Sequence, residues 1–231
     1  MIEPEVIQGI IKILLVCVII TAAYIISTRN LLSLVSMYSL QSVTLVFLAL
    51  ALWVLEPAPV LLGIAVVTFL SKALIIPYFI AAIQEKIRIK RDIEFHFLSP
   101  TTSLILSMSL MLVVYMALTR VLLGTPAREN HLFFFGAVIG LSLMLMGMMV
   151  MLSRKRAITK VLGFLTMENG VLLFGMFVTE LPFIIEFLII IDLIILVLLT
   201  TILTVGIDST LEDYNKRLHR FHLLQGPEES S

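Results

Sequence analysis

Five polar side chains lie inside otherwise apolar stretches of this sequence, and they are the residues best suited to chemistry. They are Gln41, Lys72, Glu168, Glu186 and Asp192. A charged side chain at the centre of a bilayer costs roughly 3 kcal/mol on insertion scales, so such residues usually serve packing or the movement of charge. Burial favours the protonated form of a carboxyl group, and a nearby lysine opposes this effect. Carboxyl groups beside a buried lysine are therefore typical of proton transfer.

The depth of these residues in their apolar stretches is similar. Glu168 lies near the middle of its stretch, about 18 Å from each end at the helical rise per residue. Lys72, Asp192 and Gln41 fall at a similar depth in three other stretches, whereas Glu186 lies nearer the outer surface. If these stretches are neighbouring helices, the side chains form a polar line parallel to the membrane plane. We expect protons to pass along this line.

A purely structural interpretation stays open beside the proton path. In it, Lys72 neutralises Glu168 or Asp192 and ties helices together. The sequence favours the proton path because the five polar residues include three acids but one lysine. A fixed ion pair would not need the additional acids. In either interpretation we expect Asn169 and Gln41 to form hydrogen bonds across helices, which is the ordinary use of amides in membranes.

The elements that position these residues are predicted to be membrane-spanning helices. The chain of 231 residues is 60% hydrophobic and 14% charged, against roughly 45–50% and 25% for soluble domains. Stretches of about 20 apolar residues span a bilayer as helices, and this chain shows none of the short alternating segments of a barrel. We therefore predict an all-α, polytopic membrane helix bundle with seven transmembrane helices, at residues 6–27, 31–54, 59–83, 100–123, 132–152, 157–179 and 182–206.

The distribution of Lys and Arg predicts the orientation of the bundle. Cytoplasmic segments of membrane proteins collect these residues. Most of them fall on the side that faces the cytoplasm if the N-terminus is outside and the C-terminus inside. The longest connection, residues 84–97, is basic and serves as an orientation anchor or as a docking surface for a cytoplasmic partner or anionic lipid. We expect a multi-pass protein of the cell membrane.

A faint internal repeat predicts how the chain is divided. Sliding the segment around Gln41 onto the segment around Glu168 aligns the two spans and the proline-containing connections that follow them. Two three-helix units in the same orientation would result. We predict a first unit with its basic cytoplasmic loop, a linking helix, a second unit and a cytoplasmic amphipathic tail, at residues 1–99, 100–123, 124–207 and 208–231.

The sequence predicts no catalytic residue, cofactor or metal site. The single cysteine, Cys17, excludes a cysteine-ligated cluster. The histidines fall at the ends of spans or outside them, so no pair of helices offers axial ligands to a buried haem: His96, His131, His219 and His222. We also expect no nucleic-acid partner.

The second three-helix unit resembles subunit K of respiratory complex I, which Mrp-type cation/proton antiporters share as their small C subunit. The residues that carry the resemblance are the basic run Arg154-Lys155-Arg156, Glu168 and Glu186. The family places a mid-membrane Glu in one span and a second acid among small residues in the next. Here Glu186 is surrounded by large apolar residues and Asp192 lies deeper, so both are candidates for the second acid.

The whole chain resembles component E of the hydrogenase-4 and formate-hydrogenlyase-type membrane complexes. The similar pieces are Glu186 with Asp192 and the runs Tyr38-Ser39-Leu40-Gln41-Ser42, Phe69-Leu70-Ser71-Lys72-Ala73-Leu74-Ile75-Ile76-Pro77 and Met167-Glu168-Asn169-Gly170. The resemblance implies a membrane-arm subunit beside antiporter-like subunits, coupled to a nickel–iron hydrogenase or other redox module in the cytoplasm. The subunit would carry part of a lateral proton path. The alternatives are a subunit of an Mrp-type antiporter, a scaffold, and a stand-alone transporter.

Overall fold

The computed structural model consists of helices and short connecting residues in the part of the chain that it describes. That part comprises residues 3–28, 30–87, 99–122, 130–154, 157–178, 190–192, 194–195, 197–198 and 201. No strand occurs among these residues, in agreement with the predicted all-α class. The helices are α1 (Pro4–Ser27), α2 (Leu31–Leu55), α3 (Pro59–Thr68), the π-helical η1 (Phe69–Ile75), α4 (Ile76–Ile87), α5 (Pro100–Val121), α7 (His131–Ser153) and α8 (Ala157–Val178).

Local sequence explains where these helices begin. Three of them, α1, α3 and α5, start with proline, whose missing N–H costs nothing in the first turn and whose φ angle suits a helix. Side chains cap the starts of α2, α5 and α7. Asn30, Ser99 and Asn130 accept hydrogen bonds of 3.2, 3.2 and 3.4 Å from N–H groups in the first turn.

Six helices in the described residues are long and apolar enough to cross a membrane, which indicates a multi-pass membrane protein. They are Pro4–Ser27, Leu31–Leu55, Pro59–Ala82, Thr101–Val121, His131–Ser153 and Ile158–Phe177. These correspond to the first six predicted spans. The seventh, at 182–206, lies mostly outside the described residues, and each residue described between 190 and 201 is helical. The total of seven spans and the orientation stay predictions.

The third span differs from its prediction in two ways. The sequence predicts a helix over about 59–83, whereas in the structure its middle is π-helical and its last part, α4, continues to Ile87. The helix therefore runs into the start of the connection predicted at 84–97. Most of that connection, the tail at 208–231 and Glu186 lie outside the described residues, and the division into two units stays a prediction.

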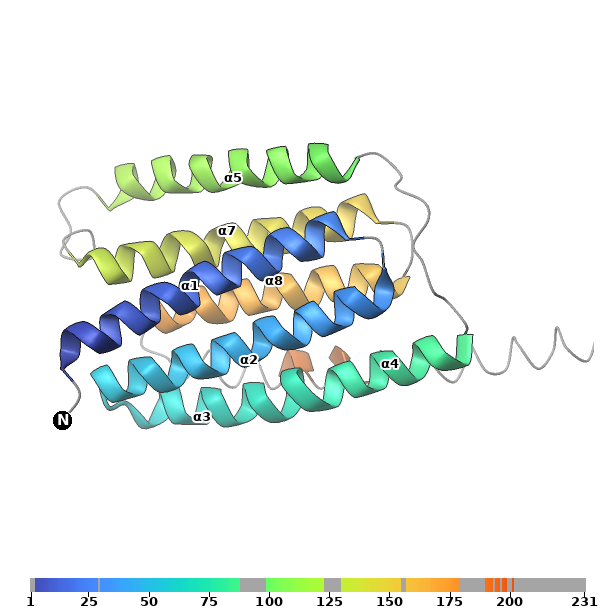
Figure 1. Ribbon diagram of the computed structural model, residues 1–231, viewed down its shortest axis with the longest axis horizontal. Coiled ribbons are helices and arrows are strands. Elements are labelled where there is room, and N and C mark those ends of the chain that lie inside the picture. The colour runs from blue at the N-terminus through green and yellow to red at the C-terminus, as the bar shows by residue number, and fades with distance from the viewer. Residues whose placement is uncertain are drawn as a thin grey trace, which may run out of the picture.

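The helices lie side by side, with α5 at one edge of the bundle and the continuous α3–η1–α4 helix at the opposite edge (Figure 1). Between them α1 packs on α2, α7 packs on α8, and each pair contacts the other through α1 with α7 and α2 with α8. The buried share of the apolar stretch is 72% in α8 and 11% in α5. Among these spans α8 is therefore the most buried and α5 the least.

Glycines allow α7 and α8 to approach closely. A Cβ atom added at Gly140, Gly147 or Gly170 would overlap backbone atoms of the facing helix, well inside van der Waals contact. Small residues are common where membrane helices pack, because water does not drive apolar surfaces together inside a bilayer. This contact holds α8 in place.

Arg154 connects the ends of two helices. It follows α7 and is buried, and its Nη2 donates to the carbonyl oxygens of Ile26 at 3.1 Å and Thr28 at 2.9 Å. These groups lie at the C-terminal end of α1, where carbonyls lack partners within the helix and attract positive charge. The ends of α1 and α7 thus lie on the same side of the bundle.

Candidate functional site

Lys72 lies at the centre of η1, where the helix widens. The N–H of Ile76 donates to a carbonyl five residues earlier instead of four. Pro77 follows directly, and because it has no N–H it cannot complete a regular helical bond to Ala73. The Ala73 carbonyl accepts instead a hydrogen bond of 3.1 Å from the Ser39 hydroxyl of α2. A π-type turn of this kind often marks a functional position.

Lys72, Glu168 and Asp192 form one buried cluster that connects three parts of the chain. Lys72 Nζ lies 3.0 Å from Glu168 Oε1 and 3.9 Å from Asp192 Oδ1. The exposed fractions of the three residues are 0%, 2% and 7%. The Lys72–Glu168 contact is the closer of the two ion pairs. Two carboxyl groups thus share one ammonium.

Asn169 connects this cluster to α2 and α1. Its Oδ1 accepts from Lys72 Nζ at 3.5 Å, and its Nδ2 lies 3.2 Å from Gln41 Oε1. Gln41 Nε2 donates to Thr21 Oγ1 at 3.3 Å, and Thr21 donates to the carbonyl of Val18 at 2.8 Å. The predicted hydrogen bonds of these amides across helices are therefore confirmed, and one of them joins the two amides to each other. Every donor in this series points away from Lys72.

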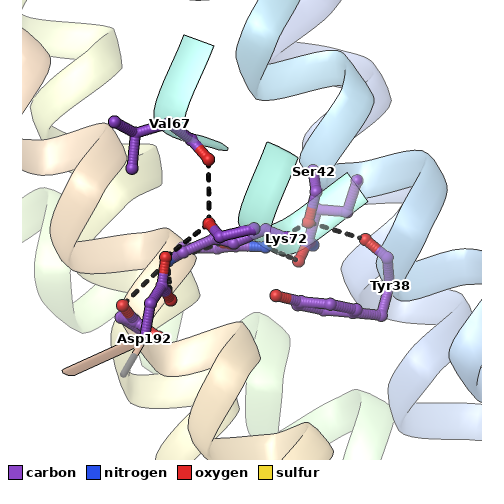
Figure 2. Close-up of polar contacts among 9 residues, drawn as sticks. Tyr38, Ser42, Val67, Lys72 and Asp192 are labelled. Atoms are coloured by element: carbon purple, nitrogen blue, oxygen red, sulfur yellow. Dashed lines mark hydrogen bonds and ion pairs between the residues drawn. The ribbon is translucent and has the colours of Figure 1, made fainter. Parts of the chain in front are cut away.

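The Ser71 hydroxyl has one hydrogen to donate and lies beside two possible acceptors. Its Oγ lies 2.9 Å from the Val67 carbonyl and also contacts Asp192 Oδ2 (Figure 2). A hydroxyl group has one hydrogen to donate and two lone pairs that accept. Ser71 therefore either donates to an ionised Asp192, or donates to Val67 and accepts the proton of a neutral Asp192. The two arrangements differ by one proton on Asp192.

Tyr38 completes the surroundings of the cluster from α2. Figure 2 shows Lys72 between Asp192 on one side and Tyr38 and Ser42 on the other. Tyr38 is fully buried, and its hydroxyl has no hydrogen-bond partner among the described residues. It interacts electrostatically with both Glu168 and Asp192.

The charges of the cluster determine what chemistry it can perform. Lys72 neutralises one of the two carboxylates, and Glu168 and Asp192 repel each other when both are ionised. An unbalanced charge is costly in this apolar surrounding, so charge balance requires one proton besides those of the ammonium. Either carboxyl group can carry it. The arrangement can therefore hold and transfer a proton.

The structure brings together most residues that the sequence singled out. Lys72, Glu168 and Asp192 are in contact, and Gln41 joins them through Asn169. Glu186 lies outside the described residues, and the role of the set in proton transfer stays a prediction.

Sequence reasoning missed Ser71 and Tyr38 as members of the site. Ser71 precedes Lys72. Tyr38 lies three residues before Gln41 and therefore on the same side of α2, and this spacing is the signal that was available.

No set of three or more His, Cys, Asp or Glu side chains suited to a metal ion gathers within the described parts of the chain. No family model, curated protein or solved structure matches this chain. A functional assignment therefore depends on the cluster and on the motifs in the sequence.

Proposed function

We propose that this chain is a membrane-arm subunit of an ion-translocating, complex I-like hydrogenase or formate hydrogenlyase in the cell membrane, with seven spans, its N-terminus outside and its C-terminus inside. The observation that carries the proposal is the buried cluster of Lys72, Glu168 and Asp192. Lys72 and Glu168 lie near the middle of their spans, Pro59–Ala82 and Ile158–Phe177. The motifs shared with component E subunits support the same assignment.

In this proposal the cluster is one station of a lateral proton path. A proton on Glu168 moves to the Asp192 carboxylate, Glu168 becomes the ionised group, and Lys72 pairs with it. Asp192 then passes the proton to a carboxyl group or bound water in the neighbouring subunit, and Glu168 takes up the next one. Glu186 continues the path nearer the outer surface. Electrons travel only in the partner subunits.

The amides of Asn169 and Gln41 limit the direction of this path. Their N–H groups donate hydrogen bonds away from Lys72. A side-chain amide does not release a proton near neutral pH, so it cannot pass one on. The series ends at the backbone carbonyl of Val18, which cannot accept a proton for transfer. The side of the cluster towards α1 is therefore closed, and protons use the side with Asp192 and Ser71.

Replacing Glu168 by glutamine tests the relay. The change keeps the shape of the side chain and removes its proton-carrying group, so we expect proton translocation by the assembled complex to fall about a hundredfold or more. Translocation is measured in sealed membrane vesicles, with the redox activity of the partners followed in parallel. Glu56→Gln, at an exposed carboxylate after α2, is the matched control. Normal translocation by an assembled Glu168→Gln complex would contradict the relay.

A scaffold function is the second candidate, and one observation favours it. The ammonium of Lys72 has three hydrogens and is surrounded by three acceptors, from Glu168, Asn169 and Asp192. Such an arrangement ties helices together whether or not a proton moves. Replacing both Lys72 and Glu168 by glutamine separates the two functions. A scaffold regains stability and translocation in the double variant, whereas a relay regains stability alone.

Isolation from the native membrane tests the assembly. We expect antiporter-like subunits and a nickel–iron hydrogenase or related redox module to be purified together with the chain in mild detergent, and mass spectrometry identifies them. Antiporter-like subunits without a redox module would favour an Mrp-type exchanger. Purification of the chain alone as a homo-oligomer would contradict both and favour a stand-alone transporter.

A further inference from the structure

The hydroxyl group of Tyr38 is buried inside the helix bundle, where an apolar side chain would be expected. The side chain is fully buried, and its Oη has no hydrogen-bond partner among the described residues. A buried donor without an acceptor costs free energy, whereas phenylalanine would fill nearly the same volume without that cost. The neighbouring Ser42 hydroxyl, which also interacts with the phenol, already donates to the carbonyl of Tyr38 and accepts from Asn169. The hydroxyl of Tyr38 therefore has another purpose.

The acceptors that lack donors lie in the adjacent cluster. Glu168 Oε2 and Asp192 Oδ1 are buried and have no hydrogen-bond partner within the described residues. The phenol points towards this cluster from α2 (Figure 2). Asp192 already contacts a hydroxyl group, that of Ser71, through its Oδ2, whereas Glu168 has no such contact among the described residues. An unused donor and unused acceptors thus lie in the same buried surrounding.

Lys72 is shared unequally between the two acids. Its Nζ is close to Glu168, at 3.0 Å, and more distant from Asp192, at 3.9 Å. A small displacement of the ammonium towards Asp192 therefore exchanges the closer partner. In the interval when both acids are ionised, after Asp192 has passed its proton on and before Glu168 has taken up the next, this displacement would leave the Glu168 carboxylate buried without its main partner, which is strongly unfavourable in this surrounding. A second donor for Glu168 removes that obstacle.

We propose that Tyr38 is a positioning residue of the cluster, whose O–H donates to the Glu168 carboxylate when both acids are ionised and the Lys72 ammonium moves to Asp192. This inference builds on the proposed function, since the exchange of partners is what a relay requires and a fixed scaffold does not. No covalent bond changes in the step. The phenol keeps its proton, and only the hydrogen-bond donor to Glu168 is replaced.

Tyr38→Phe in the full chain with its native partners tests the inference. It removes one oxygen atom and leaves the packing intact, so assembly stays normal while translocation falls about tenfold, because the buried carboxylate loses a hydrogen bond. Tyr78→Phe is the matched control, because Tyr78 is 73% exposed in α4. Wild-type translocation by the Tyr38→Phe complex would overturn the proposal.

Infrared spectroscopy of the same preparations reports on hydrogen bonds to the carboxyl groups, which a change in packing alone would not alter. The bands of Glu168 are assigned by their loss in Glu168→Gln. We expect Tyr38→Phe to shift these carboxylate bands and Tyr78→Phe to leave them unchanged. Unshifted bands in Tyr38→Phe would overturn the contact. If the wild-type complex translocates no protons, the proposed function fails, and the spectrum still decides whether Tyr38 contacts Glu168.

Discussion

Replacing Lys72 by methionine is expected to destabilise the folded chain by about 3–5 kcal/mol, which is the usual effect of removing one partner from a buried ion pair. Methionine is similar in length and apolar, so the change removes the charge while leaving little space unfilled. Glu168 and Asp192 then remain buried without the ammonium that both face. Asn169 also loses the donor to its Oδ1.

The destabilisation is measured by equilibrium unfolding of the purified protein in detergent. Lys12→Met is the matched control, because Lys12 is an exposed lysine in α1, and we expect it to change stability little. The double variant Lys72→Met with Glu168→Gln is expected to recover most of the loss, because one buried carboxylate has been removed together with the cation. A loss no greater than that of Lys12→Met would mean that the cluster does not stabilise the fold.

The depth of Lys72 and Glu168 was predictable because it depends on two simple quantities. The length of an apolar stretch defines a span, and the rise per residue then places each side chain along the membrane normal. The predicted spans consequently agree with the six that the described helices provide. The same reasoning could place Gln41 at the depth of Asn169, to which it is bonded.

The rotation of each helix about its axis was not predictable in the same way. A soluble helix shows its buried side by its apolar stripe, but a membrane helix such as α7 is apolar all round because lipid and core are both apolar. Depth alone therefore gave no sign that Tyr38 points towards the charged cluster (Figure 2), or that Ser71 contacts Asp192. Three-dimensional packing decides these contacts.

The π-helical turn around Lys72 was also beyond sequence reasoning. Its hydrogen bonds shift by one residue, and composition and hydropathy do not register that shift. The available sign was Pro77, which interrupts the regular helix but does not say how the interruption is accommodated. The compensating bond comes from Ser39, a residue distant in sequence.

Replacing Gly170 by alanine is expected to destabilise the fold by about 1–3 kcal/mol, the usual range for overpacking in a well-packed interior. The new Cβ would overlap the backbone of Met144 in α7 and approach the carbonyl of Gly140. Backbone atoms cannot turn aside as the end of a side chain can. The two helices must therefore separate.

Gly9→Ala provides a control with the opposite expectation. A Cβ at Gly9 meets nothing within 4 Å, and alanine favours a helix over glycine by about 1 kcal/mol or less. Gly9→Ala should therefore be neutral or slightly stabilising in the same unfolding measurement. Because both variants make the same chemical change in a helix, their difference isolates the contact between α7 and α8. Equal stability of the two would contradict close packing at Gly170.

The Gly170→Ala variant should also affect the cluster, although α7 does not contribute to it. Gly170 directly follows Asn169, so a displacement of α8 moves the residue that joins Lys72 to Gln41. Proton translocation at a temperature where the variant is still folded is expected to fall, while Gly9→Ala keeps the wild-type rate. The fall would follow from geometry, since no titratable group has been removed. It would link the packing of the glycines to the position of Glu168 and Asn169 in the proposed path.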